Sequence, residues 1–155
     1  DTFAIGGGCQ YLLVMDHIIA EKGSYMTLPA RKEGIIPGMA NLRLWRFTGD
    51  RIARQAIQNG LTIHSDSTEG KLICDEIIEK GTMDEKLLKT IDAYTNSGVV
   101  GSASNRRAFR IGQEPLDTFR KYMSAYCHDQ AYCHFSDALI KNLEHYWNAA
   151  SRPVK

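Results

Sequence analysis

The chain has 155 residues, of which 43% are hydrophobic and 24% charged; this is enough for one folded domain with a buried core and excludes a disordered tail. Its formal net charge is +1 and charges of both signs are interspersed, so we expect neither a nucleic acid nor an anionic membrane surface as a partner. The longest apolar run, YLLVM, is far shorter than the roughly 20 residues of a membrane span, and no basic leader precedes it, so we expect a cytoplasmic protein.

Strand and helix patterns alternate through the first 96 residues. We expect strands over 2–5, 17–23 and 72–78, a helix over 10–15, a helix over 49–60 that stops at Gly60, and a helix over 82–94 that begins with a capping box of Thr82 and Glu85. The segment 24–44 is punctuated by proline and glycine, which predicts a loop-rich crossover. The alternation predicts an α/β fold of stacked β-α units.

The pattern changes at residue 97. Three helical segments follow, over 104–111, 115–135 and 136–147, and the second has Pro115 in the favoured first-turn position. We therefore divide the chain into a core over 1–96 and an all-helical region over 97–155. Because this region is rich in aromatic residues, we expect it to cap the core or to pack on a neighbouring subunit.

The cysteines and histidines give weak signals. Cys9, Cys74, Cys127 and Cys133 have no disulfide framework spacing, so we expect reduced thiols. The run YCHDQAYCH, residues 126–134, groups cysteine with histidine, but adjacent pairs diverge on a helix and no second cluster completes a tetrahedral set. No metal site is therefore expected. His17 and His64 are expected at strand ends or on the surface, and no GxSxG elbow is present.

The glycines that lead into the first helix are the strongest chemical signal. Glycine lets a ligand oxygen approach the backbone, and free N–H groups at a helix start favour negative charge. One such N–H, directed at a thioester carbonyl, would stabilise an enolate, and an oxyanion donor of this kind is worth on the order of 3 kcal/mol. The alternative is a structural tight turn. The nearby Gln10 is an amide, which cannot act as an acid or a base at neutral pH.

The order of several separated elements resembles the central signature of the crotonase (enoyl-CoA hydratase/isomerase) superfamily. These elements are a GGGxE-type helix start, an apolar helix that ends in Asp16, a strand, a proline-led loop and the run GIIPG, and the resemblance spans roughly residues 3–80. It implies the C-terminal part of a crotonase-like ββα spiral. It also implies that Gly7 supplies one oxyanion N–H, and that the second donor lies on an earlier strand that this chain does not contain.

Two departures from the family pattern bear on the reaction. Hydratases of the family carry a catalytic Glu at the position of Gln10 and another directly after the loop proline, where this chain has Ala30. Since water must be placed and activated by carboxylates, hydration is not expected.

The combination of Gln10, LPARKEGIIPG and NLRLWRF resembles one branch more closely, the cofactor-independent 3,5-dihydroxyphenylacetyl-CoA dioxygenases of the pathway to glycopeptide antibiotics. This resemblance implies that a carbanion formed from an aryl-acetyl-CoA reacts with O₂ in a dry apolar pocket. The resulting peroxide attacks the thioester, which releases CoA and an arylglyoxylate. An enolate next to an electron-rich ring reduces O₂ directly, so no metal, flavin or other cofactor is expected.

The same resemblance assigns the candidate site. Gly7 is the expected oxyanion donor, Gln10 the residue that orients the substrate, and Gly8, Ala30 and Ile35 the wall of the substrate and O₂ pocket. Ordinary core packing is the alternative for Ala30 and Ile35. The basic runs at 31–33 and 105–107 are expected to be solvated, with contact to CoA phosphates as the alternative.

The expected partners are an acyl-CoA and O₂, a homo-oligomer that is a trimer or a pair of trimers, and an N-terminal portion of the same enzyme, supplied in the same polypeptide or as a separate chain. Two other functions stay open at this point. One is a different crotonase reaction, such as isomerisation or thioester hydrolysis. The other is a non-catalytic assembly module.

Overall fold

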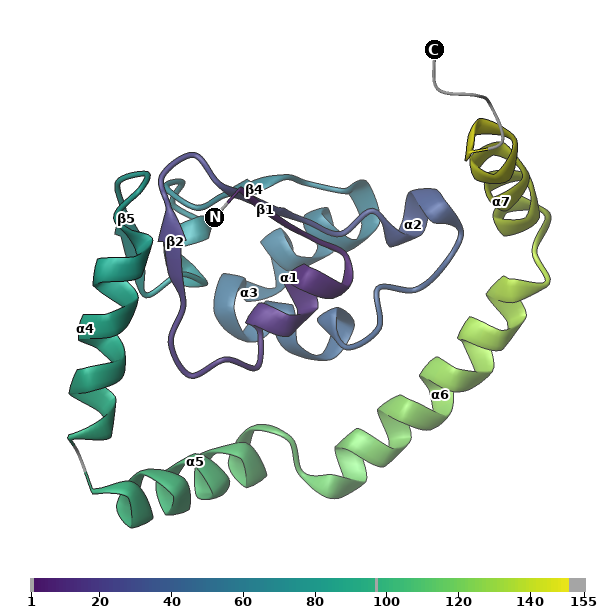
Figure 1. Ribbon diagram of the computed structural model, residues 1–155. Helices are drawn as coiled ribbons and strands as arrows, with labels where there is room; N and C mark the ends of the chain where they lie inside the picture. Colours follow the sequence, from purple (N-terminus) through teal and green to yellow (C-terminus); the bar gives the residue numbers. More distant parts are fainter. Residues whose placement is uncertain (1, 97, 151–155) are drawn as a thin grey trace.

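The computed structural model describes residues 2–96 and 98–150, and it has an α/β first part followed by an all-helical second part, as predicted (Figure 1). The first part contains two small sheets. One has the order β1 (Phe3–Ile5), β3 (Tyr25–Thr27), β4 (Ile63–His64), and the other pairs β2 (Ile19–Glu21) with β5 (Glu76–Ile78). Strand β3 runs parallel to β1 and antiparallel to β4, and β2 and β5 are parallel.

Helix α1 spans Gly7–Leu12, so it begins and ends three residues before the helix predicted over 10–15. Gly7 and Gly8 are part of its first turn instead of preceding it. Gly6 makes the turn from β1 into α1 with φ 55° and ψ −111°, a backbone conformation that residues with a Cβ rarely adopt. The first glycine of the run therefore serves the turn, and the next two lie at the helix start.

The prediction of an irregular crossover over 24–44 was wrong. This segment holds β3, the short helix α2 (Ala30–Glu33) and the first residues of α3 (Ala40–Asn59). Its proline and glycine residues mark element boundaries, since Pro29 is the N-cap of α2 and Gly34 its C-cap. Helix α3 is also longer than the helix predicted over 49–60, because it continues across a kink at Gly49, where φ is 75° and ψ is 163°.

Two further boundaries differ in part from the predictions. The segment 72–78, predicted as one strand, ends a 3₁₀ helix (Gly70–Leu72) and then forms β5. Thr82 is the N-cap of α4 (Met83–Thr95), but its hydroxyl donates to the carbonyl of Glu79 and Glu85 binds Lys89, so the capping box does not form. The predicted stop of α3 at Gly60 is confirmed.

The second part consists of α5 (Val99–Gln113), α6 (Leu116–His134) and α7 (Asp137–Ala150), which confirms three helices there. Together with α4 they follow an arc around the core (Figure 1). We call α5, α6 and α7 the helical tail. The boundary predicted between 96 and 97 falls beside residue 97, which lies outside the described residues.

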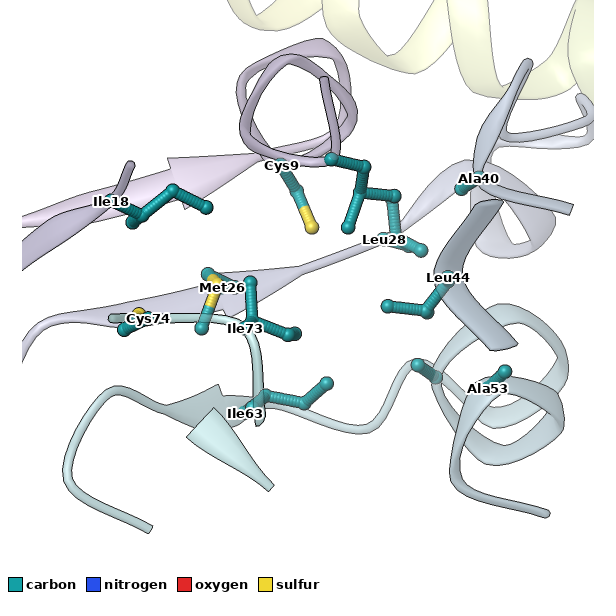
Figure 2. Packing of buried hydrophobic residues seen from close by; sticks show 12 residues of the cluster. Cys9, Ile18, Met26, Leu28, Ala40, Leu44, Ala53, Ile63, Ile73 and Cys74 are labelled. Carbon is teal, nitrogen blue, oxygen red and sulfur yellow. The ribbon is translucent and has the colours of Figure 1, made fainter. Parts of the chain in front are cut away.

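The hydrophobic core lies between the sheets, α1 and α3, and Figure 2 shows its packing. Leu28 and Leu44 are almost fully buried, and Cys9 from α1 lies among them. The tail contributes little to this core, because Leu139 is its one buried side chain among the described residues. In the described part of the chain no helix combines the length and apolar character needed to cross a membrane.

Candidate active site

Two helices begin at the same edge of the three-stranded sheet. Strand β1 leads through Gly6 into α1, and β3 leads through Leu28 and Pro29 into α2. The strands are parallel with Ile5 opposite Thr27, and the Gly6 N–H donates to the Thr27 carbonyl at 2.9 Å. The starts of α1 and α2 are therefore neighbours at the carboxyl ends of adjacent parallel strands, the position where α/β proteins commonly bind ligands.

The start of α1 exposes backbone rather than side chains. Gly7 and Gly8 are both exposed, and the first intrahelical hydrogen bond runs from the Gln10 N–H to the Gly6 carbonyl at 3.1 Å. The N–H groups that precede Gln10 in the first turn have no partner inside the helix, as at every helix start. This arrangement can donate to an anionic oxygen, but it has no group that transfers a proton.

The side chain of Gln10 is fixed by the turn that precedes α3. Its Oε1 accepts a hydrogen bond from the Met39 N–H at 2.9 Å. A Cβ at position 38 would lie 2.4 Å from this oxygen, so Gly38 makes the approach possible. Because Oε1 is already engaged, Nε2 is the end of the amide that remains to donate; among the described residues it has no hydrogen-bond partner.

The predicted pocket residues Ala30, at the start of α2, and Ile35, after its end, differ in burial. Ala30 is 5% exposed and packs into the interior, whereas Ile35 is half-buried in the loop after α2. The Ile35 N–H donates to the Ala30 carbonyl at 2.9 Å, so the two residues close one turn. Both remain predictions as pocket residues, because packing accounts for Ala30 equally well.

Two grooves lie at the other end of α1, between its C-terminus and α5. Their volumes are about 690 and 680 Å³, and Met15, Arg106 and Arg110 line both. Arg106 pairs with Asp16 at 2.6 Å, and Arg110 donates to the carbonyl of Val14. These two arginines thus attach the tail to the end of α1. Only Arg106 belongs to the basic run 105–107, and the sequence of that run did not indicate this contact.

The helical tail also holds the loop between α2 and α3. The Tyr122 hydroxyl donates to the Gly38 carbonyl, and Gln130 Oε1 accepts from the Ile36 N–H at 2.9 Å. From α7, Asn142 Nδ2 donates to the Lys32 carbonyl at 2.9 Å. Sequence reasoning missed all three side chains. The spacing of Tyr122 and Gln130 places them on one face of α6, but this spacing does not identify the loop that they bind.

The histidines lie where they were predicted. His17, half-buried just before β2, is 3.0 Å from Glu76 Oε1 through Nε2 and 3.3 Å from the Tyr94 hydroxyl through Nδ1. A hydrogen bond from Lys86 is the main cause that lowers the pKa of Glu76. His64 is exposed on β4. His17 thus joins β2, β5 and α4 away from the start of α1.

All four cysteines are free thiols in the structure. Burial raises the pKa of Cys9 to about 11 and that of Cys74 also to about 11. Cys127 is exposed, and neighbouring His128 pairs with Asp129 at 2.9 Å. Across residues 2–96 and 98–150, no cluster of three or more His, Cys, Asp or Glu side chains is arranged to hold a metal ion.

Comparison with known proteins identifies relatives of the chain. The sequence pattern described as enoyl-CoA hydratase/isomerase matches residues 2–123. The chain is also similar to the (3,5-dihydroxyphenyl)acetyl-CoA 1,2-dioxygenase of Amycolatopsis orientalis, at 44% identity over 131 residues, which are 84% of this chain and 30% of that protein.

Solved structures show the same fold at low sequence identity. An enoyl-CoA hydratase from Mycobacterium avium subsp. paratuberculosis K-10 superposes with a TM-score of 0.84 at 15% identity, over 99% of this chain and 62% of that one. An enoyl-CoA hydratase/isomerase from Pseudoalteromonas atlantica T6c gives a TM-score of 0.79 at 17% identity, with the same coverage of 99% and 62%. The chain therefore spans less than two thirds of each of these relatives.

Proposed function

The chain belongs to the enoyl-CoA hydratase/isomerase family, the crotonase superfamily, and from this premise we propose that it carries one half of an aryl-acetyl-CoA dioxygenase site. The single observation behind the proposal is the shared sheet edge. There an exposed glycine helix start adjoins an amide and an alanine, at the two positions where hydratases of the family carry carboxylates. The 44% identity to a dioxygenase supports the choice of reaction.

In the proposed reaction, the Gly7 N–H donates to the thioester oxygen while the adjacent carbon loses a proton. Gln10 donates through Nε2 and orients the substrate, and Gly8, Ala30 and Ile35 form the wall of an apolar pocket for the ring and O₂. Water exclusion matters because the enolate must meet O₂ before it meets a proton. Gln10 and Ala30 fit this need, since neither can return a proton to the carbanion.

The proposed reaction balances without a further reactant. The enolate carbon transfers electrons to O₂ and forms a carbon–oxygen bond, and the peroxide attacks the thioester carbonyl. Cleavage of the carbon–sulfur bond then releases CoA, and cleavage of the O–O bond, with loss of the second hydrogen of the same carbon as a proton, forms the keto group of the arylglyoxylate. The two protons lost from this carbon are matched by the thiol proton of CoA and the proton of the carboxylic acid. One ArCH₂C(O)SCoA and one O₂ become one ArC(O)COOH and one HSCoA. No metal or flavin is part of this scheme.

The test is oxygen uptake by the protein as it is naturally expressed, with 3,5-dihydroxyphenylacetyl-CoA as substrate. We expect one O₂ consumed for each CoA released, with no added metal or flavin, and incorporation of ¹⁸O from ¹⁸O₂ into the arylglyoxylate. CoA release at an unchanged rate under argon would exclude oxygenation and support thioester hydrolysis. A shifted double bond in an enoyl-CoA would support isomerisation.

The partners belong to the same proposal. We propose a homo-oligomer, a trimer or a pair of trimers, in which the tail helices contact other copies, because Phe135 and Trp147 are 84% and 80% exposed in the isolated chain. We also propose that an N-terminal portion of the enzyme completes the site with a second oxyanion donor. A cytoplasmic location, where thiols stay reduced, remains a prediction. If no acyl-CoA bound even to the complete protein, an assembly module would be the better description.

A further inference from the structure

The amide of Gln10 is connected to the helical tail through one peptide group. Tyr122 on α6 donates to the carbonyl of Gly38, and the N–H of Met39 donates to Gln10 Oε1 at 2.9 Å. The Gly38 carbonyl and the Met39 N–H belong to the same peptide bond, whose planarity fixes their directions relative to each other. Tyr122, this peptide group and Gln10 thus form one continuous hydrogen-bonded chain from α6 to α1.

We propose that Tyr122 is a positioning residue of the acyl-CoA site, which acts through the Gly38–Met39 peptide to keep Nε2 of Gln10, and not Oε1, directed at the substrate. This inference rests on the function proposed above. It assigns the tail a role in the chemistry beyond contacts between subunits.

The turn that precedes α3 fixes the orientation of the Gln10 amide. Its two ends differ in that Oε1 accepts and Nε2 donates, so only Oε1 can face the Met39 N–H. Gly38 has φ 48° and leaves just enough room for this oxygen. Hydrogen bonds in series polarise one another, so a donor on the carbonyl of the peptide strengthens donation by its N–H.

Tyr122 is itself well held. It is half-buried and its ring stacks on that of Tyr126, with centroids 6.2 Å apart and planes within 7°. Burial raises the pKa of Tyr122, so the hydroxyl stays protonated and able to donate. Gln130 binds the Ile36 N–H two residues before Gly38, which gives α6 a second point of contact with the same loop. The loop is therefore fixed from the side of the tail.

The experiment compares Tyr122→Phe with Tyr126→Phe in the protein as it is naturally expressed. Both variants lose one hydroxyl and keep the stacked rings. We expect kcat to fall about tenfold in Tyr122→Phe with KM nearly unchanged, and no change in either for Tyr126→Phe. In a Gln10→Ala background, Tyr122→Phe should have no further effect, because the residue through which it acts is gone.

A second readout is independent of turnover. The ¹⁵N side-chain amide resonance of Gln10 should shift in Tyr122→Phe and stay in place in Tyr126→Phe. An unchanged resonance, or an equal loss of kcat with and without Gln10, would overturn the positioning role. Absence of oxygen uptake by the unmodified protein would contradict the proposed function instead, and the amide resonance would still decide the role of Tyr122.

Discussion

Glu114, the C-cap of α5, binds Arg43 of α3 through both carboxylate oxygens, at 2.6 Å from Nε to Oε1 and 3.0 Å from Nη2 to Oε2. Arg46 adds a third contact at 3.1 Å, and the Glu114 side chain is only 15% exposed. Planar, two-point pairs of this kind are stronger than ordinary surface ion pairs. This cluster therefore fastens the junction of α5 and α6 to the core.

Replacement of Glu114 by Gln should destabilise this junction by about 2 kcal/mol, because two half-buried arginines lose their anionic partner. Chemical denaturation measures the loss, and hydrogen exchange should locate it in α5 and the start of α6. Glu85→Gln is the matched control, since it removes an exposed pair with Lys89 inside one helix. Equal effects of the two substitutions would contradict a special role for Glu114.

The same contact predicts a pH dependence. Hydrogen bonds from Arg43 lower the pKa of Glu114, so near this pKa the folded state binds fewer protons than the unfolded state. The stabilisation is therefore complete above the ordinary pKa of a glutamate and is lost as the pH falls through the lowered pKa. Denaturation curves at several acidic pH values should show this loss in the unmodified protein and a weaker one in Glu114→Gln.

Gly6→Ala should lower the free energy of unfolding by about 1–3 kcal/mol, because residue 6 has φ 55° and an L side chain is strained there. Activity should fall further than stability explains, since this turn sets the start of α1. Gly101→Ala, inside α5 with no atom within 4 Å of the added Cβ, should instead stabilise the protein by about 0.5 kcal/mol. Chemical denaturation of both variants should give changes in the free energy of unfolding that have opposite signs.

The cysteines should differ in their reactivity towards an alkylating reagent according to their burial. Iodoacetamide at neutral pH should modify the exposed Cys127 and leave Cys9 and Cys74 intact until the protein unfolds, because both buried thiols have a pKa of about 11. Peptide mass spectrometry gives the sites directly. Above about pH 9 the unfolded thiols ionise and the folded ones do not, so these two cysteines should also reduce stability as the pH rises towards 11.

Gln10→Glu should keep the hydrogen bond from the Met39 N–H, since a carboxylate oxygen can replace Oε1, but it adds a group that can return a proton to the carbanion. We expect the exchange of substrate α-hydrogens with deuterated solvent to rise at least tenfold relative to oxygen uptake. NMR of recovered substrate and an oxygen electrode measure the two rates. An unchanged ratio would show that proton return is not controlled at this position.

The sequence predicted those features that local patterns encode. Gly60 ends α3 as expected, and the helical segments predicted over 115–135 and 136–147 start within one residue of α6 and α7, whereas α5 begins five residues before the predicted 104–111. The prediction for segment 24–44 failed because the pairing of β3 with β1 and β4 is a long-range contact with little local signal. Proline and glycine there mark the ends of short elements, which have the same local appearance as a loop.

The features of the candidate site likewise fall into those that local sequence predicts and those that depend on tertiary contacts. The glycine start of α1 and the proline before Ala30 are readable from residue order, but the engagement of Gln10 Oε1 by Met39 is not. That contact depends on a turn 29 residues away and on a loop held by Tyr122 from α6. Tertiary contacts between polar side chains and backbone leave no periodic pattern, so neither Tyr122 nor Gln130 could be selected from the sequence.

The way the tail is attached has a calorimetric consequence. Its contacts with the core are mainly ion pairs and hydrogen bonds, and Leu139 is its one buried side chain among the described residues. Detachment of these helices would thus expose little new apolar surface to water, so the heat-capacity change of this step would be small. Unfolding of the sheets and α3 would give a large heat-capacity change. Added salt should screen the exposed pair of Arg106 with Asp16 and so lower the temperature at which the tail detaches, below that of the main endotherm.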